Sequence, residues 1–137
     1  ERGFTFLETA AIIVVIGILA AVAVARINST DTYATSSELE RVESHLRYAQ
    51  GKAIRTNSSW GIRFNSSNTY WLFQTTTANK KGIAGEGQTD ITLSNLSITS
   101  APQTITFDGF GSPGAAGITV STSGGNITIA ANTGFIP

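Results

Sequence analysis

The pattern of apolar and polar residues divides the chain into two unequal parts. From Phe4 to Ala25 the sequence is almost continuously apolar, FTFLETAAIIVVIGILAAVAVA. A helix of about 22 residues is roughly 33 Å long, close to the thickness of a bilayer's hydrocarbon core. The segment is therefore predicted to be a helix that can span a membrane. It contains one acid, Glu8, which is costly to keep in hydrocarbon unless it gains a partner.

A second helical pattern follows the apolar run. Residues 28–37, NSTDTYATSS, are poor in helix formers, so the helix is expected to fray, bend or restart there. Ser37 with Glu40 has the spacing of a capping box. Apolar residues then recur at steps of three and four, namely Leu39, Val42, Leu46, Ala49 and Ala53. This spacing predicts an amphipathic helix, ending near residue 55, whose apolar stripe packs on a sheet.

Beyond residue 57 the apolar period changes to two. Residues 60–64 and 70–74 alternate on either side of a polar turn at 65–68, which predicts a hairpin. Short apolar pairs follow, separated by Gly, Ser, Asn or Pro: Ile91 and Leu93, Leu96 and Ile98, Ile105 and Phe107, Ile118 and Val120, Ile127 and Ile129. Lys80–Gln88 is expected to be a mobile loop, and Ser123–Asn126 a tight hairpin turn. The predicted fold class is α+β, with a long N-terminal helix packed on an antiparallel β-sheet.

Composition limits the chemistry that the chain can carry. The 9 basic and 9 acidic residues give a net charge of zero, so nothing favours bulk attraction to nucleic acid. There is no cysteine, which excludes disulfides and thiolate chemistry. Only 13% of residues are charged, so the soluble part presents mainly Ser, Thr, Asn and Gly. Such a surface suits close packing against copies of the same chain, and no cofactor is predicted.

No catalytic or metal motif stands out. His45, the only histidine, is predicted to face solvent on the polar side of its helix, and no Ser/His/Asp arrangement is visible. The segment 108–114 is rich in glycine but lacks the lysine and following helix of a phosphate loop, so it is predicted to be a turn. Glu86, Asp90 and Asp108 could meet around calcium, although they lack ordered ligand spacing. The chain is not predicted to be an enzyme.

Two further groups of side chains have alternative interpretations. The aromatic group could be a stacking face for single strands or sugars, or else part core and part intersubunit packing: Trp60, Tyr70, Trp71 and Phe73. The basic group could form a positive patch or a solvated mixed face: Arg41, Arg47, Lys52, Arg55 and Arg63. Within it, Glu43 and Arg47 have the spacing of a surface ion pair. Glycosylation of Asn-x-Ser/Thr sites is left open.

The start of the apolar run resembles a known processing signature. Residues 2–8, RGFTFLE, resemble the cleavage region of type IV pilins and type II secretion pseudopilins. In that family a dedicated peptidase cuts between Gly and Phe, the new Phe amine is methylated, and the acid four residues on is needed for assembly. The resemblance implies a cut between Gly3 and Phe4, with Glu8 as the assembly acid. Glu8 could then pair with the Phe4 amine of a staggered neighbouring subunit.

The second half resembles the GspH/FimT branch of the same family. The similarity is carried by LRYA at 46–49, KAIR at 52–55, ITFD at 105–108 with Gly111 and Pro113, ITI at 127–129 and TGFI at 133–136. Some members of that branch bind DNA through basic residues near the C-terminus. The tail here has none, so the resemblance does not extend to that activity.

Together these features imply a modular, non-enzymatic protein. Residues 1–3 would be residual leader, 4–27 a transmembrane and filament-core helix, 28–56 its amphipathic continuation, and 57–137 a β-rich head. The resemblance implies a homo-oligomeric helical filament, storage in the bacterial inner membrane, and a prepilin peptidase, an assembly ATPase and a platform protein as partners. The alternatives are a minor or tip subunit that primes assembly or binds a substrate or DNA, a membrane-tethered binding module, and a signal-anchored enzyme.

Overall fold

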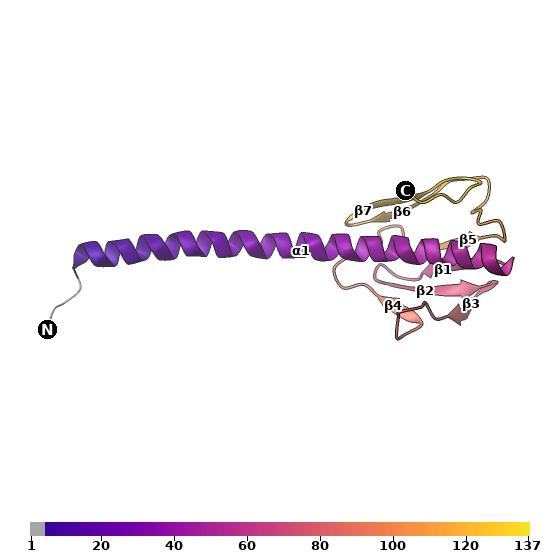
Figure 1. The fold of residues 1–137 in the computed structure, drawn as a ribbon, viewed down its shortest axis with the longest axis horizontal. Helices are drawn as coiled ribbons and strands as arrows, with labels where there is room; N and C mark the ends of the chain where they lie inside the picture. Colours follow the sequence, from indigo (N-terminus) through magenta and orange to yellow (C-terminus); the bar gives the residue numbers. More distant parts are fainter. Residues whose placement is uncertain (1–4) are drawn as a thin grey trace. The chain divides into compact units, whose positions relative to one another are not determined.

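The computed structural model describes residues 5–137, except for the side chains of residues 25–30. The chain divides into two compact units, Glu1–Ala34 and Thr35–Pro137. Figure 1 shows the helix and the strands of the described chain. In chain order these are α1 (Phe6–Thr56), β1 (Trp60–Phe64), β2 (Thr69–Gln74), β3 (Thr76–Lys81), β4 (Asp90–Thr92), β5 (Gln103–Phe107), β6 (Ile118–Thr122) and β7 (Gly125–Ile129).

Helix α1 runs from Phe6 to Thr56 without interruption, so the expectation that it frays or restarts at residues 28–37 was wrong. Extending an existing helix is far easier than starting one, so a short run of weak helix formers does not end it. The predicted capping box of Ser37 and Glu40 does not form, because both residues lie inside the helix. Local propensity is overridden here by the helical residues on both sides.

The amphipathic stripe is confirmed. Val42, Leu46, Ala49 and Ala53 are fully buried, and Leu39 is partly buried against the same core. Their partners come from both sheets, including Ile62, Phe64, Tyr70, Leu72, Ile105, Phe107, Val120, Ile127 and Ile129. The C-terminal half of α1 therefore forms one hydrophobic core with the strands that surround it in Figure 1.

A five-stranded antiparallel sheet forms most of the β-rich part. Its order is β3-β2-β1-β5, with β4 also paired to β2, while β6 and β7 form a separate hairpin. The predicted hairpin is confirmed, since β1 and β2 pair from Trp60↔Gln74 to Phe64↔Tyr70. Gly61 is required at its position, because a Cβ there would lie 2.1 Å from the Ile105 carbonyl oxygen. The predicted turn between β6 and β7 is also confirmed, with Thr122↔Gly125 as its closing pair.

Three strand and loop predictions need correction. β3 was not predicted, because its sequence TTANKK has no apolar alternation and lies exposed at the sheet edge. The expected mobile loop Lys80–Gln88 begins inside β3, and its Ile83 is only 4% exposed, packed in the core. Leu96 and Ile98 do not form a strand, since Ile98 makes only an isolated bridge to Thr122.

Candidate assembly site

The N-terminal half of α1 exposes its large apolar side chains. In Phe6–Val24 they range from 45% exposed at Ile12 to 91% exposed at Phe6. The segment has a mean hydropathy of 2.6 and is long and apolar enough to cross a membrane. An exposed apolar surface of this size is unfavourable in water and is typical of a membrane or protein contact. The segment is therefore a surface that something else must cover.

Glu8 lies in the first turn of this exposed segment. Thr5 caps the helix, since the Glu8 backbone N–H donates to the Thr5 carbonyl oxygen at 3.1 Å and to its hydroxyl at 3.3 Å. A carboxylate at a helix N-terminus is stabilised by the helix dipole. Within the described part of the chain, no cation forms an ion pair with Glu8. Glu8 thus heads an apolar surface, and no described cationic side chain among residues 5–137 is paired with it.

Both residues of the predicted processing site lie outside the described residues. Gly3 and Phe4 both fall in that N-terminal stretch. The cut between them, and the approach of a Phe4 amine to Glu8, therefore stay predictions. What the structure adds is the surface behind them: Glu8 shares one side of α1 with Ala11, Ile12, Val15 and Ile16.

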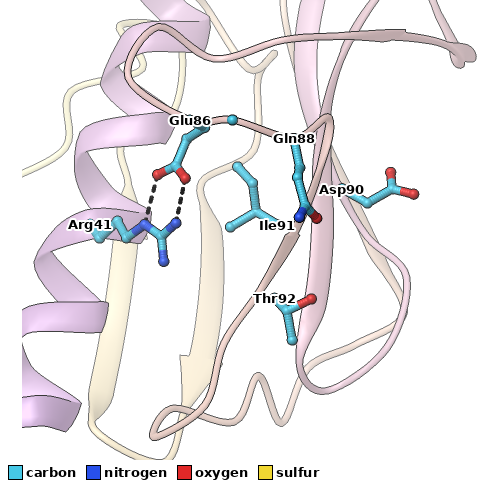
Figure 2. Close-up of a pocket in the computed structure, with 7 residues that line it drawn as sticks. Arg41, Glu86, Gln88, Asp90, Ile91 and Thr92 are labelled. Carbon is cyan, nitrogen blue, oxygen red and sulfur yellow. Dashed lines mark hydrogen bonds and ion pairs between the residues drawn. The ribbon is translucent and has the colours of Figure 1, made fainter.

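A second polar cluster lies where α1 meets the loop after β3. Arg41 donates from Nε and Nη2 to the two carboxylate oxygens of Glu86, at 2.8 and 2.5 Å (Figure 2). His45, one turn further along α1, has its Nε2 3.4 Å from the same carboxylate. Its Nδ1 lies 2.8 Å from the Tyr70 hydroxyl. These contacts fix the loop to the helix across 45 residues of sequence.

The prediction that His45 faces solvent was wrong. His45 is only 7% exposed, and burial lowers the pKa of its imidazole, with Arg41 acting in the same direction and Glu86 opposing it. One neutral tautomer satisfies both contacts, with Nδ1 accepting from Tyr70 and Nε2–H directed at Glu86. Burial raises the pKa of the Tyr70 hydroxyl, which stays protonated and available as the donor. The cluster is therefore a satisfied structural network.

The acids considered as calcium ligands do not converge. The Arg41 hydrogen bonds lower the pKa of the Glu86 carboxyl, and Asp90 pairs with Lys80 at 2.5 Å. The Asp108 carboxylate instead accepts the backbone N–H groups of Phe110 and Ser112, which confirms the predicted turn. Across residues 5–137, the described His, Cys, Asp and Glu side chains form no group of three that could hold a metal ion.

The aromatic and basic groups are mostly engaged within the head. Trp60, Tyr70 and Phe73 are buried, whereas Trp71 lies partly exposed under the Lys80 ammonium, 4.0 Å from the ring centroid. All members of the basic group except Arg55 have separate partners within the described chain: Arg41 pairs with Glu86, Arg47 with Glu43, Arg63 with the Thr104 hydroxyl, and Lys52 with the rings of Tyr48 and Trp60. This arrangement favours a mixed face over a positive patch.

The sequence of the head decides the family. Residues 38–134, more than half of the chain, match the model of the type II transport protein GspH. The chain belongs to the GspH family. This confirms the resemblance to type II secretion pseudopilins, whose family is structural rather than enzymatic. The match begins inside α1, so the GspH-family region includes the buried stripe, and Glu8 lies outside it.

Two solved structures share the fold of this chain. The type IV minor pilin FimU of Pseudomonas aeruginosa, in space group P21, aligns at a TM-score of 0.56 with 18% identity, covering 75% of this chain and 86% of FimU. A second FimU crystal form, P65, gives 0.55 and 19%, covering 74% and 90%. These matches show the pilin fold: an N-terminal apolar helix and an antiparallel sheet. No curated protein matches the chain.

Proposed function

We propose that this GspH-family protein is a structural subunit of a type IV pilus-like filament, built by packing the apolar halves of α1 from many copies. The observation that carries the proposal is the exposed apolar segment Phe6–Val24 with a single acid, Glu8, in its first turn. Before assembly, lipid of the inner membrane would cover this surface. In the filament, identical segments of neighbouring subunits would cover it instead.

Glu8 would set the register of that packing. After cleavage between Gly3 and Phe4, the new amine of Phe4 would carry a positive charge at the start of the helix. A neighbouring copy shifted along the filament axis could place its Glu8 against that amine. A buried carboxylate without a partner is strongly unfavourable, so the pairing would favour the correct stagger over others.

The proposed division of labour follows the chain. Residues 4–27 would form the membrane anchor and filament core, 28–56 the continuation into the head, and 57–137 the outer surface. Prepilin peptidase would remove residues 1–3, and an assembly ATPase with a membrane platform protein would extract the subunit. The filament would stand in the periplasm or outside the cell.

A second candidate role is that of a minor subunit that primes assembly. It is favoured by the match to GspH over residues 38–134, and the minor pilin FimU shares the fold. In this role the same Glu8 pairing would operate, but the protein would be present in few copies. Counting copies per filament by quantitative mass spectrometry distinguishes a shaft subunit from a minor one.

The test is the substitution Glu8→Ala, with filaments counted by electron microscopy and the N-terminus analysed by mass spectrometry. We expect filament number to fall at least tenfold while cleavage and methylation of Phe4 continue. Glu40→Ala is the matched control, because Glu40 is another exposed acid on α1 but lies beyond the apolar segment. Normal filament numbers with Glu8→Ala, or a mature protein that keeps Glu1, would contradict the proposal.

A further inference from the structure

Strand β4 leaves one side of the sheet open. β2 pairs with β3 through residues 72–74 and with β4 through residues 69–71, so two short strands share one edge. In the described chain no strand pairs with the other side of β4. Asp90–Thr92 is therefore an edge of three residues. An unpaired edge is a template for another extended segment.

The direction of the free backbone groups follows from the ladder. The Leu93 N–H donates to the Asn68 carbonyl oxygen at 2.8 Å, so Leu93 and the residue two before it, Ile91, direct their backbone groups toward β2. The alternate residues, Asp90 and Thr92, therefore direct N–H and C=O away from the sheet. The backbone N–H and C=O groups of Asp90 are about 6.6–6.8 Å from those of Thr92, because a strand rises about 3.3–3.4 Å per residue. The backbone groups of a second strand have the same spacing and could pair with them.

A hollow of about 320 Å³ lies beside this edge (Figure 2). Its lining includes all three residues of β4, and the Arg41–Glu86 pair forms the opposite wall. Arg41 uses Nε and Nη2 for Glu86, which leaves its Nη1 amino group as a donor, and its side chain is 37% exposed. On the other face of the strand, the Asp90 side chain is 56% exposed beside Lys80.

We propose that this β4 groove, formed by Asp90–Thr92 and the Arg41–Glu86 wall, binds an extended segment of a different protein, and that this segment adds a strand to the sheet. The segment would exchange backbone hydrogen bonds with Asp90 and Thr92. Its inward side chain, opposite Ile91, would carry an oxygen acceptor for Arg41. Its outward side chains would include a cation next to Asp90. This interaction goes beyond filament assembly and does not depend on Glu8.

The experiment uses the full chain, labelled with ¹⁵N, in detergent micelles. The probe is the peptide TVKNKVT, which places asparagine inward and both lysines outward when it pairs with β4. We expect peptide at millimolar concentration to shift the amide signals of β4 and to slow amide exchange at Asp90 and Thr92 at least tenfold. Changes confined to another surface, or no change at all, would overturn the proposal.

Two matched variants test whether backbone pairing is responsible. Thr92→Pro removes an outward N–H that the β2 ladder does not use, whereas Thr92→Val keeps it. We expect peptide affinity to fall at least tenfold with Thr92→Pro and to stay within twofold with Thr92→Val. Equal binding by both variants would contradict strand addition.

The peptide itself gives a test that does not alter the protein. N-methylation of its two lysine amides should abolish binding, because these amides face β4. N-methylation of the asparagine amide, which points away from β4, should leave binding within a few-fold. Equal loss with both peptides would overturn the pairing. Protection of β4 that rises with protein concentration without peptide would show that a second copy occupies the groove, which also contradicts the proposal.

Discussion

The two halves of α1 differ in what covers their apolar side chains. From Phe6 to Val24 the large apolar residues are exposed, whereas Val42, Leu46, Ala49 and Ala53 are fully buried against the sheets. Covering one large apolar side chain contributes about 1.5–3 kcal/mol. The second half obtains this stabilisation within its own chain. The first half can obtain it only from lipid or from other molecules, and this difference separates folding from assembly.

The largest change in stability is expected from a substitution in the buried half of α1. Leu46→Ala should lower the free energy of unfolding of the head by about 2–5 kcal/mol, because it leaves a cavity in a fully packed core. Ile13→Ala, on the exposed half, should change it by less than about 0.5 kcal/mol. Urea unfolding of the full chain in detergent, followed by the fluorescence of Trp60 and Trp71, measures both. Similar losses for the two variants would refute the comparison.

The acids of α1 differ in the same way as its apolar side chains. Glu38 accepts backbone N–H groups from Ser94, Asn95 and Leu96, at 3.0, 2.9 and 2.9 Å. Burial alone would raise the pKa of its carboxyl, but these three hydrogen bonds together lower it below the ordinary value. Glu8 has no such set of partners from another segment of the described chain. Glu38 thus joins α1 to the head, whereas Glu8 is proposed to join one copy to another.

A smaller loss is expected when the Glu38 contact is removed. Glu38→Ala should destabilise the head by about 1–3 kcal/mol, because the N–H groups of Ser94, Asn95 and Leu96 lose a charged acceptor. Glu40→Ala, two residues along the same helix, should stay within about 0.5 kcal/mol. The same urea experiment measures both, and amide exchange at residues 94–96 should quicken only in the Glu38 variant. Unchanged exchange there would show that water replaces the carboxylate without loss.

Periodic patterns allowed the helix and most strands to be predicted, because burial of an apolar stripe is a local property of sequence. They failed where a distant partner decides the outcome. Glu86 follows Arg41 by 45 residues, and nothing near either residue indicates the pair. His45 did carry a local signal: it lies three residues after Val42 and four before Ala49, at the border of the buried stripe. Its polarity alone led to the wrong placement.

The candidate assembly site was predicted from the sequence only in part. The position of Glu8 in a long apolar helix follows from the sequence, and the structure places it in the first turn. The Thr5 cap was missed, although Thr5 and Glu8 have the spacing of a capping box. β3 could not be predicted from burial, since an exposed edge strand of TTANKK has no buried face to impose a period.

The last prediction is that the folded protein loses stability at low pH, because His45, Glu38 and Glu86 become protonated. The pKa of His45 is lowered by burial, so the unfolded chain binds a proton more readily, and stability should fall as pH drops below about 6.5. Protonation would also turn Nδ1 into a donor and leave the Tyr70 hydroxyl proton without its acceptor. The carboxyls of Glu38 and Glu86, with lowered pKa values, should add a further loss below about pH 4.5.

One substitution can separate the loss of stability caused by His45 from the loss caused by Glu38 and Glu86. His45→Gln should flatten the stability profile between pH 7 and about 5.5, where the unfolded histidine titrates, and leave the loss at lower pH in place. Because His45 is the only histidine, an NMR titration of the full chain reports its pKa directly. A value at or above that of an exposed histidine would mean that burial does not outweigh the attraction of Glu86. The stability that His45 contributes would then not be lost as pH falls from 7 to about 5.5, which contradicts the prediction.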